Sequence, residues 1–364
     1  MNQIFFELIQ VAIGIRICLS RTPNETGWGE LYAMAKKQSL VGVCFAGVQK
    51  LQLQSQEPPE MLYLTWMGMA AKIQQRNEVV NRQCVELQAK LSADGFCNCI
   101  LKGQGVGQHY AEYLQGLRQS GDIDVWIEGG VEAVVKLAKN LGQKADVTEQ
   151  HVHLGIFEST EVEAHFIPSM LRNPFANARL QNWFKKMEPL QFANRNENGL
   201  CVPTTEFNLV YLLIHIYRHL FAEGVGMRQV TDYYFVLQKV RSNETDCKEC
   251  KERAFKTIQQ LGLANFAGAL MYAMREMFGL QHEQMLCDPN ERHGKFLLNE
   301  ILISGNMGHH DERLKEAHMG SRWQRFCMVT MHNMRLISYY PAETLWAPFT
   351  RIKIWAWRKW NGWI

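Results

Sequence analysis

The spacing of apolar residues changes twice along the chain, and this change limits the folds that the sequence can adopt. From Gly27 to Ala93 apolar residues recur at helical intervals. From Phe96 to Ile167 short apolar runs and alternating patterns predict strands connected by turns and helices. Helical intervals return from Thr204 onward. The sequence therefore predicts an α+β protein with a small mixed β-sheet core flanked by N- and C-terminal helical regions.

The same changes suggest where these regions begin and end. We expect a helical N-terminal region over residues 1–91, a core over 92–187 and a helical C-terminal region over 188–364. Strands are expected over 97–101, 122–127, 151–157 and 160–167, and helices over 106–114, 131–141, 204–221, 227–240, 247–261 and 265–278.

The bulk composition narrows the class of protein. With 364 residues, of which 47% are hydrophobic and 21% charged, the chain is expected to fold as a globular protein. A formal net charge of +3 gives no argument for a surface that coats nucleic acid, so we expect any basic site to be local. The ten cysteines are scattered, and no stretch reaches the roughly 20 apolar residues of a membrane span. We therefore expect a cytoplasmic protein without a transmembrane segment.

Two aspartates alternate with apolar residues in the second expected strand. Asp122 and Asp124 project from one side of this strand, whereas Ile123 and Val125 enter the core. Two close carboxylates repel each other unless a cation lies between them. Because the ligands are hard oxygens, the pattern favours Mg²⁺ over zinc.

A third carboxylate is expected from the last strand of the core. Glu161, Glu163 and His165 share one face of this strand, opposite the apolar residues. If the strand pairs beside the aspartate strand, Glu163 completes a second metal site and helps to deprotonate an attacking hydroxyl. Glu161 remains the alternative, because the register of two strands is not encoded in the pattern of one.

Two glycines lie between the first expected strand and the helix after it. Gly103 and Gly105 would let backbone NH groups approach a phosphate at the positive end of that helix. A tight turn without a ligand is the alternative interpretation.

Taken in order, these motifs resemble a known superfamily. The run Leu101 to Gly103, then Arg118, then Gly121 to Val125, resembles the polymerase-β-like nucleotidyltransferases. The resemblance is closer to a bacterial family of uncharacterised nucleotidyltransferases, in which a histidine-containing helix follows. The matching residues here are His215, His219, Arg228 and Asp232. The resemblance covers about residues 101–237, and the run from Gly308 to Asp311 is a further candidate. Where the wider superfamily has serine after the glycine of the turn, this chain has Gln104.

The resemblance implies an activity and a set of site residues. Two Mg²⁺ ions would bind a nucleoside triphosphate, with ATP expected, while an acceptor hydroxyl attacks the α-phosphorus and pyrophosphate leaves. Catalysis and metal binding are assigned to Asp122, Asp124 and Glu163. Nucleotide binding is assigned to Lys102, Gly103, Gln104, Arg118, His215, His219, Arg228 and Asp232.

Other interpretations remain open from the sequence. The acceptor of the nucleotide is a small molecule, a protein side chain or an RNA end. A non-catalytic nucleotide sensor or assembly protein that keeps the fold is the main alternative, and a nucleic-acid-binding protein is a weaker one. His215 and His219 also suit a buried structural network. The tryptophan-rich segment 351–360 is expected to form a helix on the protein's own core rather than a nucleic-acid or membrane surface.

Overall fold

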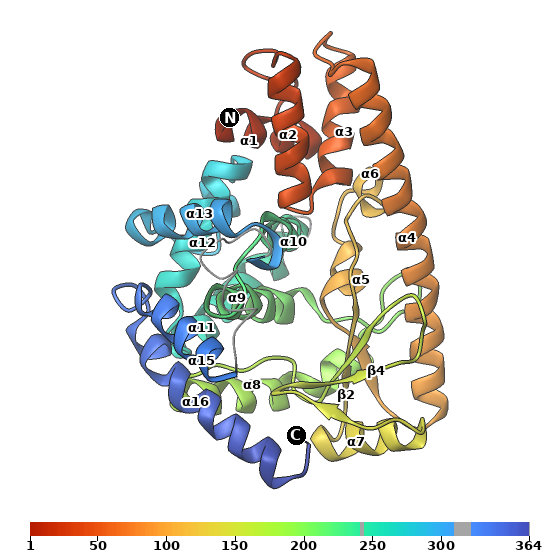
Figure 1. Cartoon of the computed structure of the whole chain (residues 1–364), viewed down its shortest axis with the longest axis vertical. Coiled ribbons are helices and arrows are strands. Elements are labelled where there is room, and N and C mark those ends of the chain that lie inside the picture. Colours follow the sequence, from red (N-terminus) through yellow and green to blue (C-terminus); the bar gives the residue numbers. More distant parts are fainter. Residues whose placement is uncertain (241–243, 309–321, 364) are drawn as a thin grey trace.

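The fold places a small sheet beneath a larger set of helices (Figure 1). This computed structural model describes residues 1–240, 244–308 and 322–363. His309, His310 and Asp311, which the sequence suggested as further site residues, lie outside the described residues.

Strands occupy only the middle of the chain, as the change in apolar spacing predicted. The strands are β1 (Asn98–Ile100), β2 (Ile123–Ile127), β3 (Asp146–Val147), β4 (His151–Leu154) and β5 (Val162–His165). The helices before and among them are α1 (Asn2–Ala12), α2 (Glu25–Lys37), α3 (Val41–Gln52), α4 (Glu60–Ala93), α5 (Lys102–Gly107), α6 (Glu112–Gln115) and α7 (Gly130–Asn140). Those that follow are α8 (Pro174–Ala193), α9 (Thr205–Phe221), α10 (Met227–Lys239), α11 (Glu244–Gln260), α12 (Ala264–Phe278), α13 (Glu291–Ser304), α15 (Arg322–Met334) and α16 (Pro341–Trp360), with 3₁₀ turns η2 (His282–Gln284) and η3 (Asn306–Gly308). The predicted α+β class with a small mixed sheet is confirmed.

The sheet has the strand order β1-β2-β5-β4-β3. Strands β2 and β5 pair in parallel, and the other neighbouring pairs are antiparallel. The parallel register places Asp124 opposite Glu163 and Trp126 opposite His165. The two acidic segments of the sequence are therefore adjacent in the centre of the sheet.

One face of the sheet packs on α4 and α7. Its apolar residues alternate along β2 and form a cluster with the C-terminal half of α4 and one side of α7, comprising Val80, Cys84, Leu87, Leu91, Ile123, Val125, Ile127, Val134, Leu137 and Ala138 among others. The opposite face packs on helices of the C-terminal region, where the ring centroids of Trp126 and Phe207 lie 5.8 Å apart. The carboxylates of β2 and β5 point toward this second face.

Helix α4 connects the sheet to the N-terminal helices, and it runs along most of the molecule in Figure 1. It begins directly after Pro58 and Pro59, as proline's fixed φ favours. The first half of α4 buries Trp66, Ala70 and Ile73 in the larger helical cluster, whereas its second half covers the sheet. The expected boundary at residue 91 lies near the end of α4, and that at 187 lies inside α8, so the three-region division stays a prediction.

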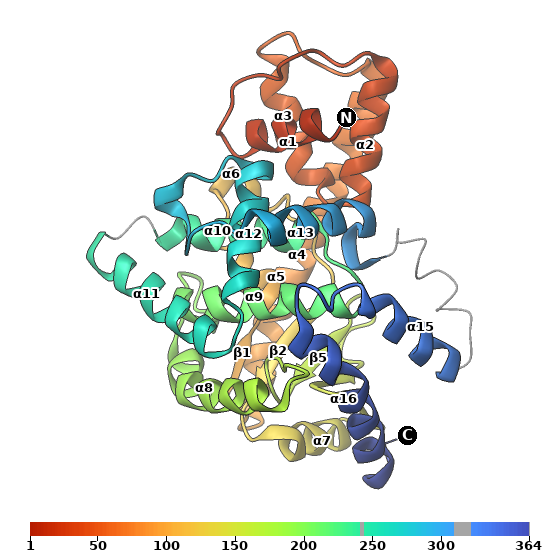
Figure 2. The same cartoon turned by 90° about the vertical axis from the view of Figure 1, so that its left-hand side faces the viewer.

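The C-terminal helix α16 lies beside the sheet region in both views (Figures 1 and 2). Glu343 accepts hydrogen bonds from the backbone NH groups of Arg172 and Asn173, which fixes the start of this helix. Trp357 and Trp363 pack against the sheet cluster, whereas the side chains of Trp355 and Trp360 are exposed. The predicted helix on the protein's own core is thus present, although only part of its aromatic surface is buried.

Three expectations differ from the structure. The helix expected over 106–114 is two short helices, α5 and α6, and α5 begins at Lys102 directly after β1. The strands expected over 151–157 and 160–167 are shorter, because β4 ends at Leu154 and β5 at His165. Helix α8 was not expected, since its apolar residues are sparse and Pro189 interrupts the pattern.

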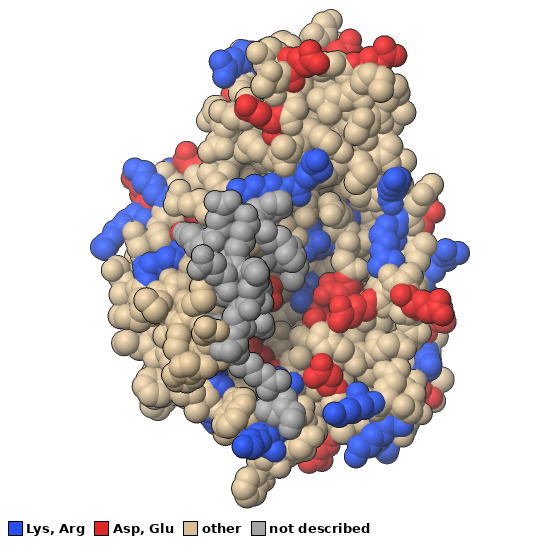
Figure 3. All heavy atoms as spheres, in the orientation of Figure 1, with Lys and Arg blue, Asp and Glu red and all other residues tan. Residues whose placement is uncertain are grey.

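The surface agrees with the small net charge. Basic and acidic side chains are interspersed on the face shown in Figure 3 rather than gathered in one large patch of a single sign. Among the described residues, no helix is long and apolar enough to cross a bilayer.

Candidate functional site

A pocket lies between the sheet and the helices α9 and α10, with a volume of about 280 Å³. Its sheet side is formed by Lys102, Gly103, Gly121, Asp122, Asp124, Thr148, Glu149, Gln150, His151 and Glu163. Its helical side is formed by Leu212, His215, Ile216, Arg218, His219, Ala222, Glu223, Arg228, Gln229 and Asp232, together with Arg118, which precedes β2 and bonds to α10. Ten of the eleven residues that the sequence singled out therefore line one cavity.

Three carboxylates converge on the sheet side of this pocket. Asp122 directly precedes β2, and Asp124 and Glu163 are partners across the parallel pair. Asp122, Asp124 and Glu163 each offer an oxygen, and these atoms all lie within 4.8 Å of one another. Glu161 lies elsewhere, because its side chain is exposed and its Oε1 is 2.6 Å from His153 Nδ1. The register thus brings Glu163, and not Glu161, to the aspartate pair.

The carboxyl groups of Asp122 and Asp124 have pKa values that are shifted in opposite directions. The negative charge of Asp124, together with burial, raises the pKa of Asp122. Burial alone would also raise the pKa of Asp124, but Lys102 and His165 hold it well below its ordinary value. Lys102 Nζ lies 2.6 Å from Asp124 Oδ1, and the side chains are 15% and 3% exposed. Asp124 is therefore a fixed anion, whereas Asp122 lacks a neutralising partner at hydrogen-bond distance among the described residues.

The turn after β1 positions Lys102 through an unusual backbone. Lys102 has a φ of 35° and Gly103 a φ of 34°, a region that side chains with a Cβ rarely adopt. Two residues on, a Cβ on Gly105 would lie 2.4 Å from the carbonyl oxygen of Ile100, so only glycine lets α5 approach β1 this closely. Strained backbone of this kind is concentrated at functional sites. The glycines thus shape the turn that brings Lys102 to Asp124.

Histidines form a row beside the carboxylates. His165 is fully buried, and its Nε2 lies 2.8 Å from Asp124 Oδ1 and 3.3 Å from Glu163 Oε2. His151, the cross-strand partner of His165, places its Nδ1 3.3 Å from the same Glu163 oxygen. Burial and the neighbouring imidazoles lower the pKa of His151 to about 2, so this ring is neutral near pH 7. Two imidazoles thus lie next to the acidic cluster.

The helical side is organised by a buried ion pair. Arg118 makes two hydrogen bonds of 2.7 Å to the carboxylate of Asp232 on α10, and the hydroxyl of Tyr110 donates a third. The remaining nitrogen of Arg118, Nη1, is buried with no hydrogen-bond partner. Arg228 donates from Nη1 to the carbonyl of Gln119 at 3.0 Å. Burial, with Arg118 nearby, lowers the pKa of Arg228. Two guanidinium groups therefore border the cavity opposite the carboxylates.

The remaining predicted residues have different surroundings. The rings of His215 and His219 lie 4.4 Å apart on α9, and His219 Nδ1 is 3.5 Å from Glu223 Oε2. Neither belongs to a group of three metal ligands among the described residues. Gln104 does not line the pocket, and its side-chain amide instead donates to Asn81 Oδ1 at 2.5 Å on α4.

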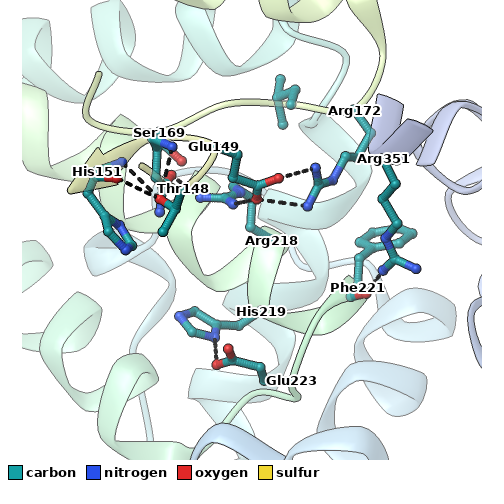
Figure 4. Close-up of polar contacts among 12 residues, drawn as sticks. Thr148, Glu149, His151, Ser169, Arg172, Arg218, His219, Phe221, Glu223 and Arg351 are labelled. Carbon is teal, nitrogen blue, oxygen red and sulfur yellow. Dashed lines mark hydrogen bonds and ion pairs between the residues drawn. The ribbon is translucent and has the colours of Figure 1, made fainter. Parts of the chain in front are cut away.

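Sequence reasoning missed an ionic cluster that joins the two sides of the pocket (Figure 4). Glu149, between β3 and β4, binds both Arg172 and Arg218, and these cations lower the pKa of its buried carboxyl to about 2. Arg351 of α16 lies beside them and reaches the carbonyl of Phe221. The roles of His151 and His165 were also missed, although the alternation of β5 had placed His165 on the same face as Glu163.

A glycine turn, an acidic strand and opposing basic side chains around one cavity are in keeping with the nucleotidyltransferase class. Residues 24–279 match the model of a family described as an uncharacterised nucleotidyltransferase. Because this match spans well over half of the 364 residues, the chain belongs to that family. The suspected family is thus confirmed. A comparison with curated proteins gave no significant match.

Proposed function

We propose that this protein is a divalent-metal-dependent nucleotidyltransferase that moves a nucleoside monophosphate from a nucleoside triphosphate to an acceptor hydroxyl. The main support is the convergence of Asp122, Asp124 and Glu163, whose ligand atoms lie within 4.8 Å of one another in the family's matched region. Three carboxylates from two neighbouring strands would hold Mg²⁺, which prefers hard oxygen ligands. When bound, the ions neutralise charge that develops on the triphosphate.

The chain's own residues have distinct roles in this proposal. Lys102 and the unpaired Nη1 of Arg118 would bind phosphate oxygens, and Arg228 would add a further cation. The acceptor oxygen forms a bond to the α-phosphorus, the bond to the β-phosphate oxygen breaks, and pyrophosphate leaves. Glu163 would receive the hydroxyl proton, for which it is suited because burial raises the pKa of its carboxyl.

The ion pair between Arg118 and Asp232 would hold the phosphate-binding nitrogen of Arg118 in place. A bidentate guanidinium–carboxylate pair fixes the plane of the arginine, so the free nitrogen points in one direction. His215 and His219 would contact the nucleotide from α9, since both line the pocket. Gln104 is not assigned a role here because it bonds to α4.

The experiment that tests the proposal is label transfer. The full-length protein is incubated with Mg²⁺ and each α-³²P-labelled triphosphate, ATP first, together with cell extract divided into small-molecule, protein and RNA fractions. Wild-type protein should release pyrophosphate and label one fraction, which identifies the acceptor class. Asp122→Asn should not. Asp146→Asn, an exposed carboxylate in β3 of the same sheet, is the matched control and should retain activity.

A nucleotide-binding protein without transferase activity is the second candidate. It is favoured by the contact of Lys102 with Asp124, which already neutralises one carboxylate, and by the orientation of Gln104 away from the pocket. Such a protein would bind a triphosphate and release no pyrophosphate with any acceptor fraction. Equal labelling by wild type and Asp122→Asn would count against the transferase.

A further inference from the structure

We propose that His151, Glu163 and His165 form a second cation site, one that selects a first-row transition ion such as Mn²⁺ over Mg²⁺. This site shares Glu163 with the proposed all-oxygen site but adds two nitrogen ligands. Its use in catalysis rests on the proposed function, whereas its capacity to bind a metal does not.

The three donor atoms come from paired positions of two antiparallel strands. His151 on β4 lies directly opposite His165 on β5, and Glu163 lies two residues before His165 on the same face. One ring nitrogen of His151, one of His165 and a Glu163 oxygen all lie within 4.8 Å of one another. Backbone pairing fixes the positions of all three residues, so binding needs no large rearrangement.

The spacing of these atoms matches that of ligands around one ion. Ligands at about 2.0–2.2 Å from a metal are separated by roughly 3.0 Å when octahedral and roughly 3.4 Å when tetrahedral. Glu163 Oε2 lies 3.3 Å from His151 Nδ1 and 3.3 Å from His165 Nε2. Asp124 Oδ1, at 2.8 Å from the same His165 nitrogen, is placed to become a fourth ligand.

One of the donor atoms has no hydrogen-bond partner of its own. His151 Nδ1 is buried and makes no hydrogen bond, although it faces Glu163. The ring of His151 is held from its other side, where Nε2 lies 3.2 Å from His153 Nε2. A buried nitrogen without a hydrogen bond is costly unless something binds it. The metal would displace the proton that His165 Nε2 shares with Asp124, and this proton passes to water.

The ligand set determines which ion is preferred. Imidazole binds Zn²⁺ more strongly than Mn²⁺, but both of these ions accept nitrogen ligands more readily than Mg²⁺ does. Mg²⁺ favours oxygen ligands and retains bound water. Two imidazoles and a carboxylate are therefore a poor Mg²⁺ site and a good transition-metal site. The pocket would then hold two positions of different selectivity that meet at Glu163.

The test is pulsed electron paramagnetic resonance of the full-length protein loaded with Mn²⁺, without nucleotide. Directly bound imidazole nitrogens give ¹⁴N modulation of the Mn²⁺ echo, which oxygen ligands do not. Wild type should show this modulation in the presence of a tenfold excess of Mg²⁺. His151→Gln should lose part of the modulation and bind Mn²⁺ about tenfold more weakly. His219→Gln, which removes an imidazole from the opposite wall of the same pocket, should match wild type.

Two outcomes would overturn the proposal. One is wild-type protein that binds no Mn²⁺ or shows a spectrum with oxygen ligands alone, a result that does not depend on any variant folding. The other is equal modulation in wild type and His151→Gln. Asp122→Asn separates this site from the proposed transferase, because the variant should keep the nitrogen modulation even though it transfers no label. If wild-type protein shows nitrogen modulation but transfers no label, the proposed transferase activity is rejected and the proposed metal site is supported.

Discussion

The two walls of the pocket are built in different ways. On the sheet wall, Asp124 and Glu163 come from adjacent strands whose register brings them together, and Asp122 directly precedes the first of these strands. On the helical wall, the polar groups take their positions from partners distant in sequence, as Arg118 and Asp232 do across 114 residues. The sheet wall concentrates like charges, whereas the helical wall pairs opposite ones.

Because of this difference, substitutions on the two walls should have different effects on activity and on stability. Like charges that raise each other's pKa cost folding free energy unless a ligand neutralises them, so their presence points to a ligand. A buried ion pair carries no net charge, and losing one partner is expensive because it leaves the other charge buried and uncompensated. Substitutions on the sheet wall should therefore reduce activity without loss of stability, and those on the helical wall should reduce both.

The sharpest test on the sheet wall is Asp122→Asn. We expect label transfer to fall by about 10³-fold or more, which corresponds to over ~4 kcal/mol of transition-state stabilisation. Since Asp124 raises the pKa of Asp122, removal of the Asp122 charge relieves repulsion in the folded state. The free energy of unfolding in urea at pH 7 should therefore not fall. A clear loss of stability would break the distinction between the two walls.

On the helical wall, the corresponding change is Asp232→Asn. This substitution leaves the buried guanidinium of Arg118 without a counter-charge and should lower the free energy of unfolding by roughly 3–4 kcal/mol. Urea denaturation measures it. Exposed Asp288, which contacts His282 at the surface, provides the matched control, and Asp288→Asn should change stability by less than about 0.5 kcal/mol.

A double variant measures the energy of the interaction between Arg118 and Asp232. If the cost of Asp232→Asn is the unpaired Arg118 charge, then Arg118→Met combined with Asp232→Asn should be more stable than the sum of the two single effects predicts. Strict additivity would show that the two side chains contribute independently.

The same contrast explains what the sequence could predict. The alternation from Asp122 to Val125 is local, so it correctly indicated a strand with both carboxylates on one side. The pairing of Asp124 with Glu163 depends on how two strands separated by a helix and a hairpin come together, which no single pattern contains. On the helical wall the sequence singled out Arg118, Arg228 and Asp232 as nucleotide-binding residues but gave no sign that Asp232 bonds to Arg118. Long-range ion pairs leave no periodic signal.

The ion pairs of Glu149 join the two walls, and their contribution to stability depends on pH. The pKa of Glu149 is lowered from 4.5 to about 2 in the folded protein, because the arginines outweigh the effect of burial. A carboxyl with a depressed folded pKa contributes stability above its unfolded pKa and loses it as the pH falls through the folded value. The full contribution is about 3 kcal/mol, of which about 2 kcal/mol is lost between pH 6 and pH 3.

The measurement compares wild type with Glu149→Gln by urea denaturation at pH 6, 4 and 3. The variant should be the less stable protein at pH 6, and the difference should shrink as the pH falls. A difference that stays constant with pH would mean that Glu149 acts through its size or hydrogen bonds and not through its charge. Such a result would also weaken the view that this cluster joins the walls by ion pairing.

The smallest effect is expected for Gln104→Ser, which installs the residue that the wider superfamily carries after the glycine of the turn. Gln104 faces α4, where its amide donates to Asn81 and, at 3.5 Å, to Asn77, so the substitution removes these two hydrogen bonds and should cost about 1 kcal/mol of stability. Because the side chain does not line the pocket, kcat/KM for label transfer should change less than about threefold. An increase of tenfold or more would mean that a hydroxyl at this position reaches the triphosphate. The turn after β1 would then belong to the catalytic wall, and its sequence would be what limits the activity of this chain.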